Sequence, residues 1–288
     1  MKLIRFGEKG KEKPGILIEG QRFDCSSHFE DWNRAFFNNN GISELKKMLE
    51  NGVKQMPLVN AHERWANSIA RPGMIMCIGL NYSDHAKESG MDIPSEPILF
   101  MKASNTISGP YDDVIIPKNS QKTDWEVELG VVLGKDVLYL KNEEEAQEAI
   151  AGYVVVNDIS ERAFQLERGG QWVKGKSCPG FTAVGPYLAT KDEISDVLNL
   201  KMQLLVNGVQ KQNGNTKTMI FYPTYVVWYC SQFMQLEAGD LISTGTPPGV
   251  GLGFSPPQYL TDGDKVSLGI EGLGKQHQLF HSFKMNTD

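Results

Sequence analysis

The chain has 288 residues, of which 40% are hydrophobic and 22% are charged, and its formal net charge at pH 7 is −6. These values are typical of a globular protein that can bury a substantial core. The acidic balance and the lack of a Lys/Arg cluster argue against a nucleic-acid partner. No apolar stretch approaches the length of a membrane span, and the first residues lack an apolar signal region, so we expect a cytoplasmic protein.

Residues 1–70 are predicted to form a small α+β domain. Short strands are expected at 3–5 and 15–18, with a turn at 19–20, and an amphipathic helix is expected at 42–50. No chemistry is indicated in this part of the chain.

The character of the sequence changes at Arg71-Pro72-Gly73, which is a turn signal. The residues that follow, 74–79, form a continuous apolar run that is typical of a central strand. We therefore predict a domain boundary here and a second, larger domain over residues 71–288.

A short helix is predicted after this strand, with Ser83 as its N-cap and Gly90 just beyond its end. His85 and Glu88 are three residues apart and share one helix face. Because a carboxylate orients a neighbouring imidazole, this pair can supply a general base. So short a helix is marginal alone, which favours a lid that orders over a ligand. The alternative is a surface helix with an incidental pair.

Two carboxylates interrupt an otherwise apolar run at 123–133. In a strand, Glu126 and Glu128 point to the same face. Two like charges on a rigid strand need a cation, and a hard divalent ion accepts oxygen ligands. The best candidate for a third ligand is Asp158, which ends another apolar run at 153–158. The alternative is an exposed edge strand with solvated glutamates.

Helical spacing after Asp158 predicts that Arg162 and Gln165 lie on the same side as this carboxylate. Arg162 can anchor a carboxylate through two hydrogen bonds and Gln165 can act as a neutral donor, although either could equally be a helix salt-bridge partner. Lys176 lies in a glycine-interrupted basic loop at 174–180. The spacing of this loop differs from that of a nucleotide-binding phosphate loop.

The four cysteines are widely separated and form no CxxC pair, so neither a zinc site nor a disulfide framework is expected. Cys178 could be a nucleophile, but no base adjoins it, and a buried thiol is the interpretation that we favour.

A hairpin is predicted at 206–209, followed by a buried helix at 221–236 whose aromatic side chains belong to the core. A strand then leads into the loop of residues 241–251, which is rich in Gly, Pro and Thr. A loop of this composition can line an anionic site. Two more strands are expected between 264 and 283.

Six motifs follow one another in a fixed order between residues 71 and 275. They are Gly79-Leu-Asn-Tyr-x-x-His85-x-x-Glu88, Asp124-x-Glu126-x-Glu128-Leu-Gly, Asn157-Asp158-x-x-x-Arg162-x-x-Gln165, Gly175-Lys176-Ser177, Val206-Asn-Gly208 and Thr244-Gly-Thr-Pro-Pro-Gly-Val-Gly251. This series strongly resembles the fumarylacetoacetate hydrolase superfamily, and its order is more specific than any single motif.

The resemblance implies an α+β protein with a mixed β-sandwich or β-roll catalytic domain, assembled as a homodimer. It also implies a Mg²⁺ or Mn²⁺ ion held by Glu126, Glu128 and Asp158. In the fumarylacetoacetase branch a further aspartate joins the metal shell near the place of Asn81, so the chain is interpreted as the three-ligand bacterial type.

Within the family, the chain looks most like 2,4-diketo-3-deoxy sugar-acid hydrolases, and similar sequences also carry the name ureidoglycolate lyase. The resulting hypothesis is cleavage of the C3–C4 bond of a 2,4-diketo acid whose C1 carboxylate and C2 carbonyl chelate the metal. His85, oriented by Glu88, would activate water, and Lys176 would help the metal to stabilise the pyruvate enolate. The residues expected to contact the substrate are Arg162, Gln165 and Thr246.

Several alternatives remain open on the same scaffold, because its chemistry diverges after the shared chelate. They are oxaloacetate decarboxylation, acylpyruvate hydrolysis, tautomerisation or isomerisation, and ureidoglycolate cleavage. A non-catalytic metal-binding protein is an alternative of another class. It would need neither the His85/Glu88 pair nor Lys176.

Overall fold

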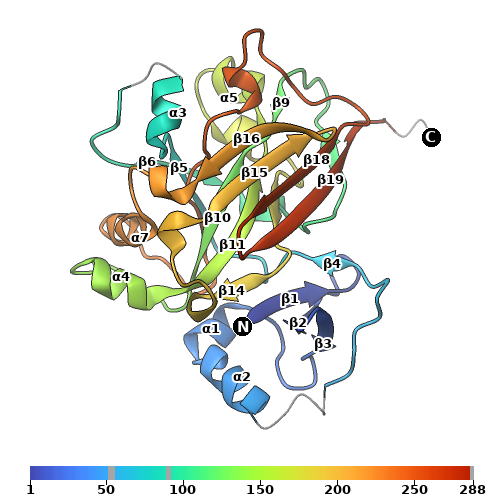
Figure 1. Cartoon of the computed structure of the whole chain (residues 1–288), viewed down its shortest axis with the longest axis vertical. Helices are drawn as coiled ribbons and strands as arrows, with labels where there is room; N and C mark the ends of the chain where they lie inside the picture. The colour runs from blue at the N-terminus through green and yellow to red at the C-terminus, as the bar shows by residue number, and fades with distance from the viewer. Residues whose placement is uncertain (51–55, 89–91, 286–288) are drawn as a thin grey trace.

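The computed structural model describes residues 1–50, 56–88 and 92–285, and two β-sheets dominate these ranges (Figure 1). The main path of the larger sheet runs through β3 (Gln21–Asp24), β2 (Lys13–Ile18), β1 (Lys2–Phe6), β14 (Leu188–Thr190), β11 (Ile150–Asp158), β10 (Val127–Leu133), β17 (Leu241–Ser243), β5 (Ile75–Gly79) and β6 (Ile98–Lys102). Beside this path lie β4 (Trp65–Ala66), β7 (Ile107–Ser108) and β13 (Thr182–Val184).

The second sheet has the order β16 (Val209–Asn215), β15 (Lys201–Val206), β18 (Lys265–Ile270), β19 (Gly274–Ser282) and β8 (Val114–Ile116). A small pair joins β9 (Thr123–Asp124) and β12 (Ser160–Glu161). The α-helices are α1 (Arg34–Asn38), α2 (Gly41–Glu50), α3 (Ser83–Glu88), α4 (Glu143–Ala149), α5 (Arg162–Leu166), α6 (Val173–Lys176) and α7 (Pro223–Ser231). Within the described ranges, none of them is long and apolar enough to cross a membrane. The mixed sheets and short helices confirm the predicted α+β class.

Strand β10 is buried on both faces, and its two faces have different partners. Because side chains alternate along a strand, Leu129 and Val131 pack into the core shared with the second sheet. Val132 points the other way, into a core shared with the N-terminal residues. Glu128 belongs to this second face. The sandwich core therefore supplies the rigid support beneath the carboxylates.

The N-terminal residues lie at one end of the molecule (Figure 1) and extend the larger sheet, because β1 pairs with β14. The predicted strands, the turn and the helix at 42–50 are all present, the last as α2. Leu3 and Trp32 share a hydrophobic cluster with Ile75 and Val154. The division at residue 70 stays a prediction about folding units.

Two local predictions near the site are wrong. Ser83 is the first residue of α3 rather than its cap, and its hydroxyl donates to the carbonyl of Thr218 (3.1 Å). Gly90 lies outside the described residues. Residues 173–176 form the single turn α6, where the sequence favoured a loop.

The aromatic side chains near α7 are only partly in the core, where the sequence predicted core positions: Phe221 and Trp228 pack against it. The aromatic side chains lie in a partly exposed row in which neighbouring rings contact one another, and Phe233 is 60% exposed. The core contribution comes from Val226, Val227 and Cys230. The helix is also shorter than predicted, ending at Ser231.

Candidate metal centre and active site

Three carboxylates meet on the larger sheet. Glu126 directly precedes β10, Glu128 lies within it, and Asp158 ends the neighbouring strand β11. One oxygen from each lies within 4.8 Å of the others, and all three residues are buried. β10 pairs on both sides, with β11 and β17, so the alternative of an exposed edge strand is wrong.

The register of β10 and β11 explains this convergence. Val127 lies opposite Asn157, and the backbone N–H of Asp158 donates to the carbonyl of Glu126 (3.0 Å). Glu126 and Asp158 are therefore neighbours across the strands. Side chains at such positions are close enough to share one partner.

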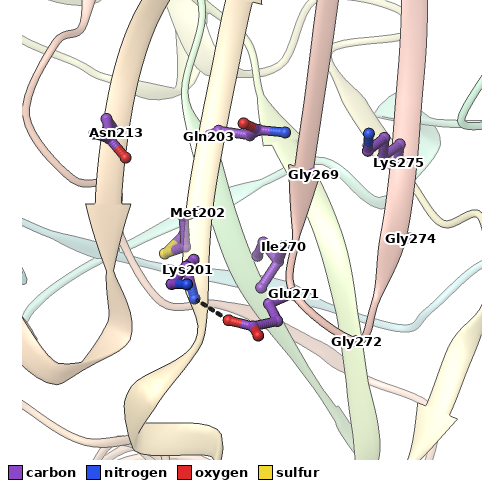
Figure 2. Close-up of a pocket in the computed structure, with 10 residues that line it drawn as sticks. All are labelled: Lys201, Met202, Gln203, Asn213, Gly269, Ile270, Glu271, Gly272, Gly274 and Lys275. Atoms are coloured by element: carbon purple, nitrogen blue, oxygen red, sulfur yellow. Dashed lines mark hydrogen bonds between the residues drawn. The ribbon is translucent and has the colours of Figure 1, made fainter.

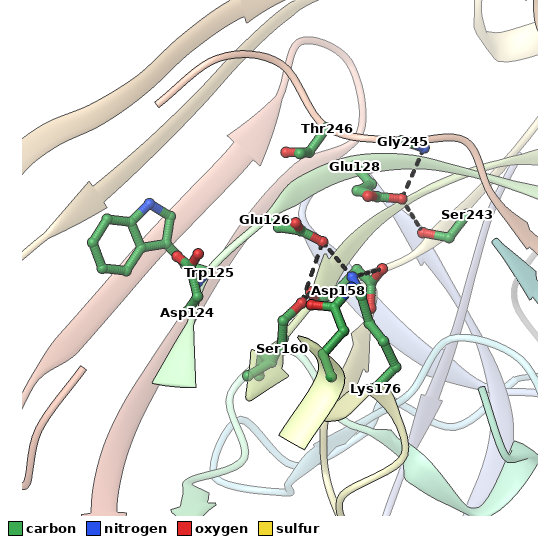
Figure 3. Close-up of polar contacts among 12 residues, drawn as sticks. Asp124, Trp125, Glu126, Glu128, Asp158, Ser160, Lys176, Ser243, Gly245 and Thr246 are labelled. Atoms are coloured by element: carbon green, nitrogen blue, oxygen red, sulfur yellow. Dashed lines mark hydrogen bonds and ion pairs between the residues drawn. The ribbon is translucent and has the colours of Figure 1, made fainter. Parts of the chain in front are cut away.

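Lys176 is that partner. Its Nζ lies 2.6 Å from Glu126 Oε2 and 2.6 Å from Asp158 Oδ2, and Figure 3 shows its side chain reaching between the two carboxylates. Burial disfavours the charged ammonium, but the carboxylates, Asp158 foremost, raise the pKa of Lys176 above its ordinary value. Lys176 is therefore a buried cation that already neutralises part of the site.

A second buried lysine, Lys102 at the end of β6, was not found from the sequence. Its Nζ donates to Asp158 Oδ1 and to the carbonyls of Ile159 (3.0 Å) and Phe181 (2.7 Å). The available signal was a charged residue closing an apolar run, which is the pattern that identified Asp158.

Arg162 connects the carboxylates to a loop. Its Nη2 donates to Glu126 Oε1 (2.6 Å) and its Nε donates to Asp124 Oδ2 (2.8 Å). Asp124 also accepts the backbone N–H groups of Gly251 (2.6 Å) and Leu252 (3.0 Å). The sequence motif includes Asp124, but its role as the link between Arg162 and this loop was missed.

Glu128 is bound differently from its neighbours. Its Oε2 accepts the hydroxyl of Ser243 (2.6 Å) and the N–H of Gly245 (2.9 Å), and no described residue forms an ion pair with it. Burial and the nearby charges of Asp158 and Glu126 raise the pKa of Glu128 to about 8. Burial acts in the same sense on Glu126, but Arg162 and Lys176 outweigh it and lower the pKa of Glu126 to about 2.

The charges of this cluster suit a divalent cation. Four carboxylates, including Asp124, contact or face three buried cations, so one negative charge is left when all are ionised. That charge belongs to Glu128, which lacks a cationic partner within the described ranges. The three oxygens that converge are hard donors, which suit Mg²⁺ or Mn²⁺.

A cavity of about 540 Å³ opens onto the carboxylates. The predicted site residues that line it are His85, Glu126, Glu128, Arg162, Gln165, Lys176 and Thr246. The side chain of Glu88 lies outside the described part, so its pairing with His85 stays a prediction.

Two of the predicted substrate contacts are already engaged. The hydroxyl of Thr246 donates to the carbonyl of Val127 (2.9 Å) and accepts from Gln212 Nε2 (2.8 Å). Arg162 Nη1 donates to Gln165 Oε1 (3.1 Å). Gln165 lines the cavity, and its amide nitrogen is the donor that it can offer to a ligand. Thr246 and Arg162 therefore shape the site as well as line it.

The cysteines contribute no visible chemistry. All four are buried and free. Burial raises the pKa of the Cys178 thiol to about 11, which keeps it protonated at neutral pH. This result fits the interpretation of Cys178 as a buried thiol.

A second hollow, of about 400 Å³, lies on the outer face of the second sheet (Figure 2). Its polar side chains are Lys201, Gln203, Asn213, Glu271 and Lys275. The carboxylate of Glu271 accepts the backbone N–H of Lys201 (3.3 Å). With one carboxylate and no converging set among these lining residues, this hollow resembles a sheet surface rather than a reaction site.

Comparisons with known proteins agree with the motifs. The family model described as Fumarylacetoacetate (FAA) hydrolase C-terminal matches residues 74–280. A Burkholderia multivorans protein is 49% identical over 284 residues, which cover 97% of this chain and 98% of that protein. It is named as a hydrolase by provisional assignment only.

Three solved structures cover nearly all of this chain. The fumarylacetoacetate hydrolase of Exiguobacterium antarcticum is 31% identical, with a TM-score of 0.85 and coverage of 98% of this chain and 100% of that one. The 2-hydroxyhepta-2,4-diene-1,7-dioate isomerase of Mycobacterium marinum is 26% identical, with a TM-score of 0.74 and 98% coverage of both chains. The maleylpyruvate hydrolase of Sphingobium sp. SYK-6, in complex with Mn²⁺ and pyruvate, shares the fold at 23% identity, with a TM-score of 0.82 and coverage of 99% and 100%.

Proposed function

The chain belongs to the fumarylacetoacetate hydrolase family, and from this membership we propose that it is a divalent-metal-dependent hydrolase that cleaves a 2,4-diketo acid into pyruvate and a second carboxylic acid. Members of the family are enzymes, either hydrolases or isomerases. The observation that carries the proposal is the buried triad of Glu126, Glu128 and Asp158, of which the two glutamates line a cavity, with Lys176 beside them.

The metal would be Mg²⁺ or Mn²⁺, bound by the three carboxylates, and would supply Lewis acidity toward the C1 carboxylate and C2 carbonyl of the substrate. His85 lines the cavity, where it can accept a proton from the water that attacks C4. As the C3–C4 bond breaks, its electron pair passes to C3. The ammonium of Lys176 stabilises the resulting enolate charge. Protonation at C3 then gives pyruvate, and C4 becomes the carboxyl carbon of the second product.

The comparisons support parts of this proposal. Mn²⁺ and pyruvate are bound in the Sphingobium maleylpyruvate hydrolase, which shares the fold. Pyruvate is the product expected here, and Mn²⁺ is one of the two ions that the three oxygens suit. The sugar-acid substrate suggested by the sequence, the homodimer and the cytoplasmic location stay predictions.

Isomerisation is the second candidate, and the similarity to the Mycobacterium marinum isomerase favours it. An isomerase could use the same metal chelate and the same enolate stabilised by Lys176, but it would move a double bond without breaking C3–C4. Decarboxylation of oxaloacetate would also pass through that enolate. These reactions differ in their products.

The test is a substrate panel with the full chain after chelator treatment, assayed with Mg²⁺, with Mn²⁺ and with neither. The panel contains several 2,4-diketo acids, an unsaturated 2-oxo acid, oxaloacetate and ureidoglycolate, and NMR identifies the products. We expect metal-dependent release of pyruvate and a carboxylic acid in equal amounts. Glu126→Gln should abolish turnover, whereas Asp112→Asn, which alters a buried ion pair outside the site, should retain it. Turnover of the other substrates alone would overturn the proposal.

A further inference from the structure

The walls of the cavity are mainly apolar, whereas its floor carries charged groups. The charged groups lie at the floor, while an apolar lining, here called the vestibule, consists of Ile78, Leu80, Ile98, Phe100, Leu166, Trp172, Val250 and Leu252. Ile98, Leu166 and Leu252 are 43%, 45% and 39% exposed. Apolar side chains exposed around an active cavity provide a surface that a ligand can cover.

One wall of the vestibule begins at the proposed reaction centre. The Nζ of Lys176 lies 5.1 Å from the centroid of the Phe100 ring, and the Phe100 and Trp172 rings meet edge to face at 5.1 Å. Trp172 packs on Gly79 so closely that a Cβ at Gly79 would lie 3.2 Å from its ring. The two rings are therefore held in place where the substrate chain would leave the enolate.

Another part of the vestibule is tied to the same ion-pair network. Asp124 accepts the backbone N–H of Leu252 and also binds Arg162, which contacts Glu126. Leu252 is consequently anchored through its backbone, while its side chain remains partly exposed.

The vestibule offers few partners for hydroxyl groups. Apart from the carboxylates and Lys176, the hydrogen-bonding side chains among the described lining residues are His85, Arg162, Gln165, Thr246 and the single indole N–H donor of Trp172. Arg162 and Thr246 already have partners within the protein. A polyhydroxylated chain buried here would lose hydrogen bonds to water without replacement, which disfavours binding.

From this lining we infer that the acyl group of the substrate, the part beyond C3, is apolar, and that Phe100, Trp172 and Leu252 determine this specificity. The inference rests on the proposed function and narrows its substrate class to 2,4-diketo acids with an alkyl or aryl acyl group. It departs from the sugar-acid substrate that the sequence suggests.

The first experiment compares kcat/KM for three substrates in the presence of Mn²⁺: an aliphatic 2,4-diketo acid with a long chain, an aryl 2,4-diketo acid and a 2,4-diketo-3-deoxy sugar acid. We expect the alkyl or aryl substrate to exceed the sugar acid by about tenfold or more, because each methylene buried in an apolar pocket adds to discrimination. A higher kcat/KM for the sugar acid would overturn the inference and leave the proposed function standing. Absence of hydrolysis of every 2,4-diketo acid would overturn both.

The second experiment uses Leu252, whose partial exposure makes a polar replacement compatible with folding. Leu252→Ser should raise KM for the long-chain substrate several-fold, and more than it raises KM for 2,4-dioxopentanoate, while changing kcat and the binding of oxalate with Mn²⁺ little. Leu252→Met should restore the low KM. The matched control is Leu198→Ser, which replaces a leucine of similar exposure, 37%, that does not line the cavity. An unchanged chain-length preference in Leu252→Ser would overturn the role of this residue.

Discussion

Lys102 is the residue whose contacts most change the interpretation of the site. It is almost fully buried, and its ammonium donates to one oxygen of Asp158 and to two backbone carbonyls. These three bonds use all the donors of a lysine. They hold Oδ1 of Asp158 in place and leave Oδ2 as the oxygen directed at the shared site, so Lys102 acts as a positioning residue.

Lys102→Met should therefore weaken metal binding by about tenfold or more, the scale typical of losing a group that orients a ligand. The free energy of unfolding should also fall, by at most about 3 to 5 kcal/mol, since the buried carboxylate of Asp158 loses one of its two cations and keeps Lys176. Calorimetric titration with Mn²⁺ measures the first effect and denaturant unfolding the second. Lys201→Met, at the exposed start of β15, is the control. An unchanged metal affinity in folded Lys102→Met would contradict the positioning role.

Metal binding should release a proton from Glu128. Its pKa of about 8 means that the metal-free carboxyl is protonated at pH 7, whereas a ligand must be ionised. Affinity should consequently rise with pH up to about 8 and then level off. Titration calorimetry in two buffers of different ionisation enthalpy should detect close to one proton per ion at pH 7. Glu128→Gln, if it still binds metal, should release none.

Glu128 and Glu126 give the stability of the metal-free fold opposite dependences on pH. The pKa of Glu128 is raised from 4.5, so the fold holds a proton that the unfolded chain releases, and this contribution to stability declines as pH rises from about 4.5 to 8. The pKa of Glu126 is lowered from 4.5 to about 2, so its contribution is present above about pH 4.5 and is lost as pH falls toward 2.

Among the elements, strands were predicted more fully than the contacts between them. The apolar run interrupted by two glutamates and the apolar run ending in Asp158 correctly located β10 and β11, because alternation within a strand is a local property. The register that brings Asp158 beside Glu126, and the approach of Lys102 from β6, depend on pairing between distant segments. The α7 region shows the opposite error, since its aromatic composition indicated a core although Tyr222 and Phe233 are exposed and Phe221 and Trp228 are only partly buried.

Helix α3 has six residues, and the contacts described for it are specific. Ala86 is buried, and the Thr218 hydroxyl donates to the Asp84 carboxylate (3.2 Å to each oxygen). His85 lines the cavity from this element, while none of the proposed metal ligands belongs to it. The metal centre should therefore persist when His85 is changed.

His85→Ala should leave Mn²⁺ and oxalate binding nearly unchanged and reduce diketo-acid hydrolysis by roughly a hundredfold or more, the scale of losing a positioned general base. Any oxaloacetate decarboxylation should be spared, since it requires no activated water. Measuring both reactions and oxalate affinity in this one variant separates loss of the base from loss of the site. Hydrolysis at near the original rate would place the base elsewhere.

At the scale of the whole molecule, residues 1–70 and the residues that follow them share one sheet and one hydrophobic cluster. β1 pairs with β14, and Arg64 forms a two-bond ion pair with Asp112. Removing residues 1–70 would expose the buried side chains of Ile75 and Val154 and the edge of β14.

A fragment of residues 71–288 should accordingly fail to fold cooperatively or should aggregate, although the sequence suggests a domain boundary there. Circular dichroism with thermal melting of the fragment and of the full chain provides the comparison. A sharp, reversible melt of the fragment would establish the predicted domain as an independent folding unit. Light scattering on the full chain, whose mass is 32.1 kDa, would test the predicted homodimer in the same preparation.

Asp124 accepts two backbone hydrogen bonds from the loop at 251–252, and this has a consequence for how the sequence of the protein could evolve. The carboxylate binds backbone N–H groups, which every residue except proline possesses, so the anchor is indifferent to the side chain at Leu252. New side chains can be presented at the same place without disturbing Arg162 or the carboxylates. Substrate preference can thus evolve, or be engineered, one substitution at a time while the chemical machinery is inherited intact.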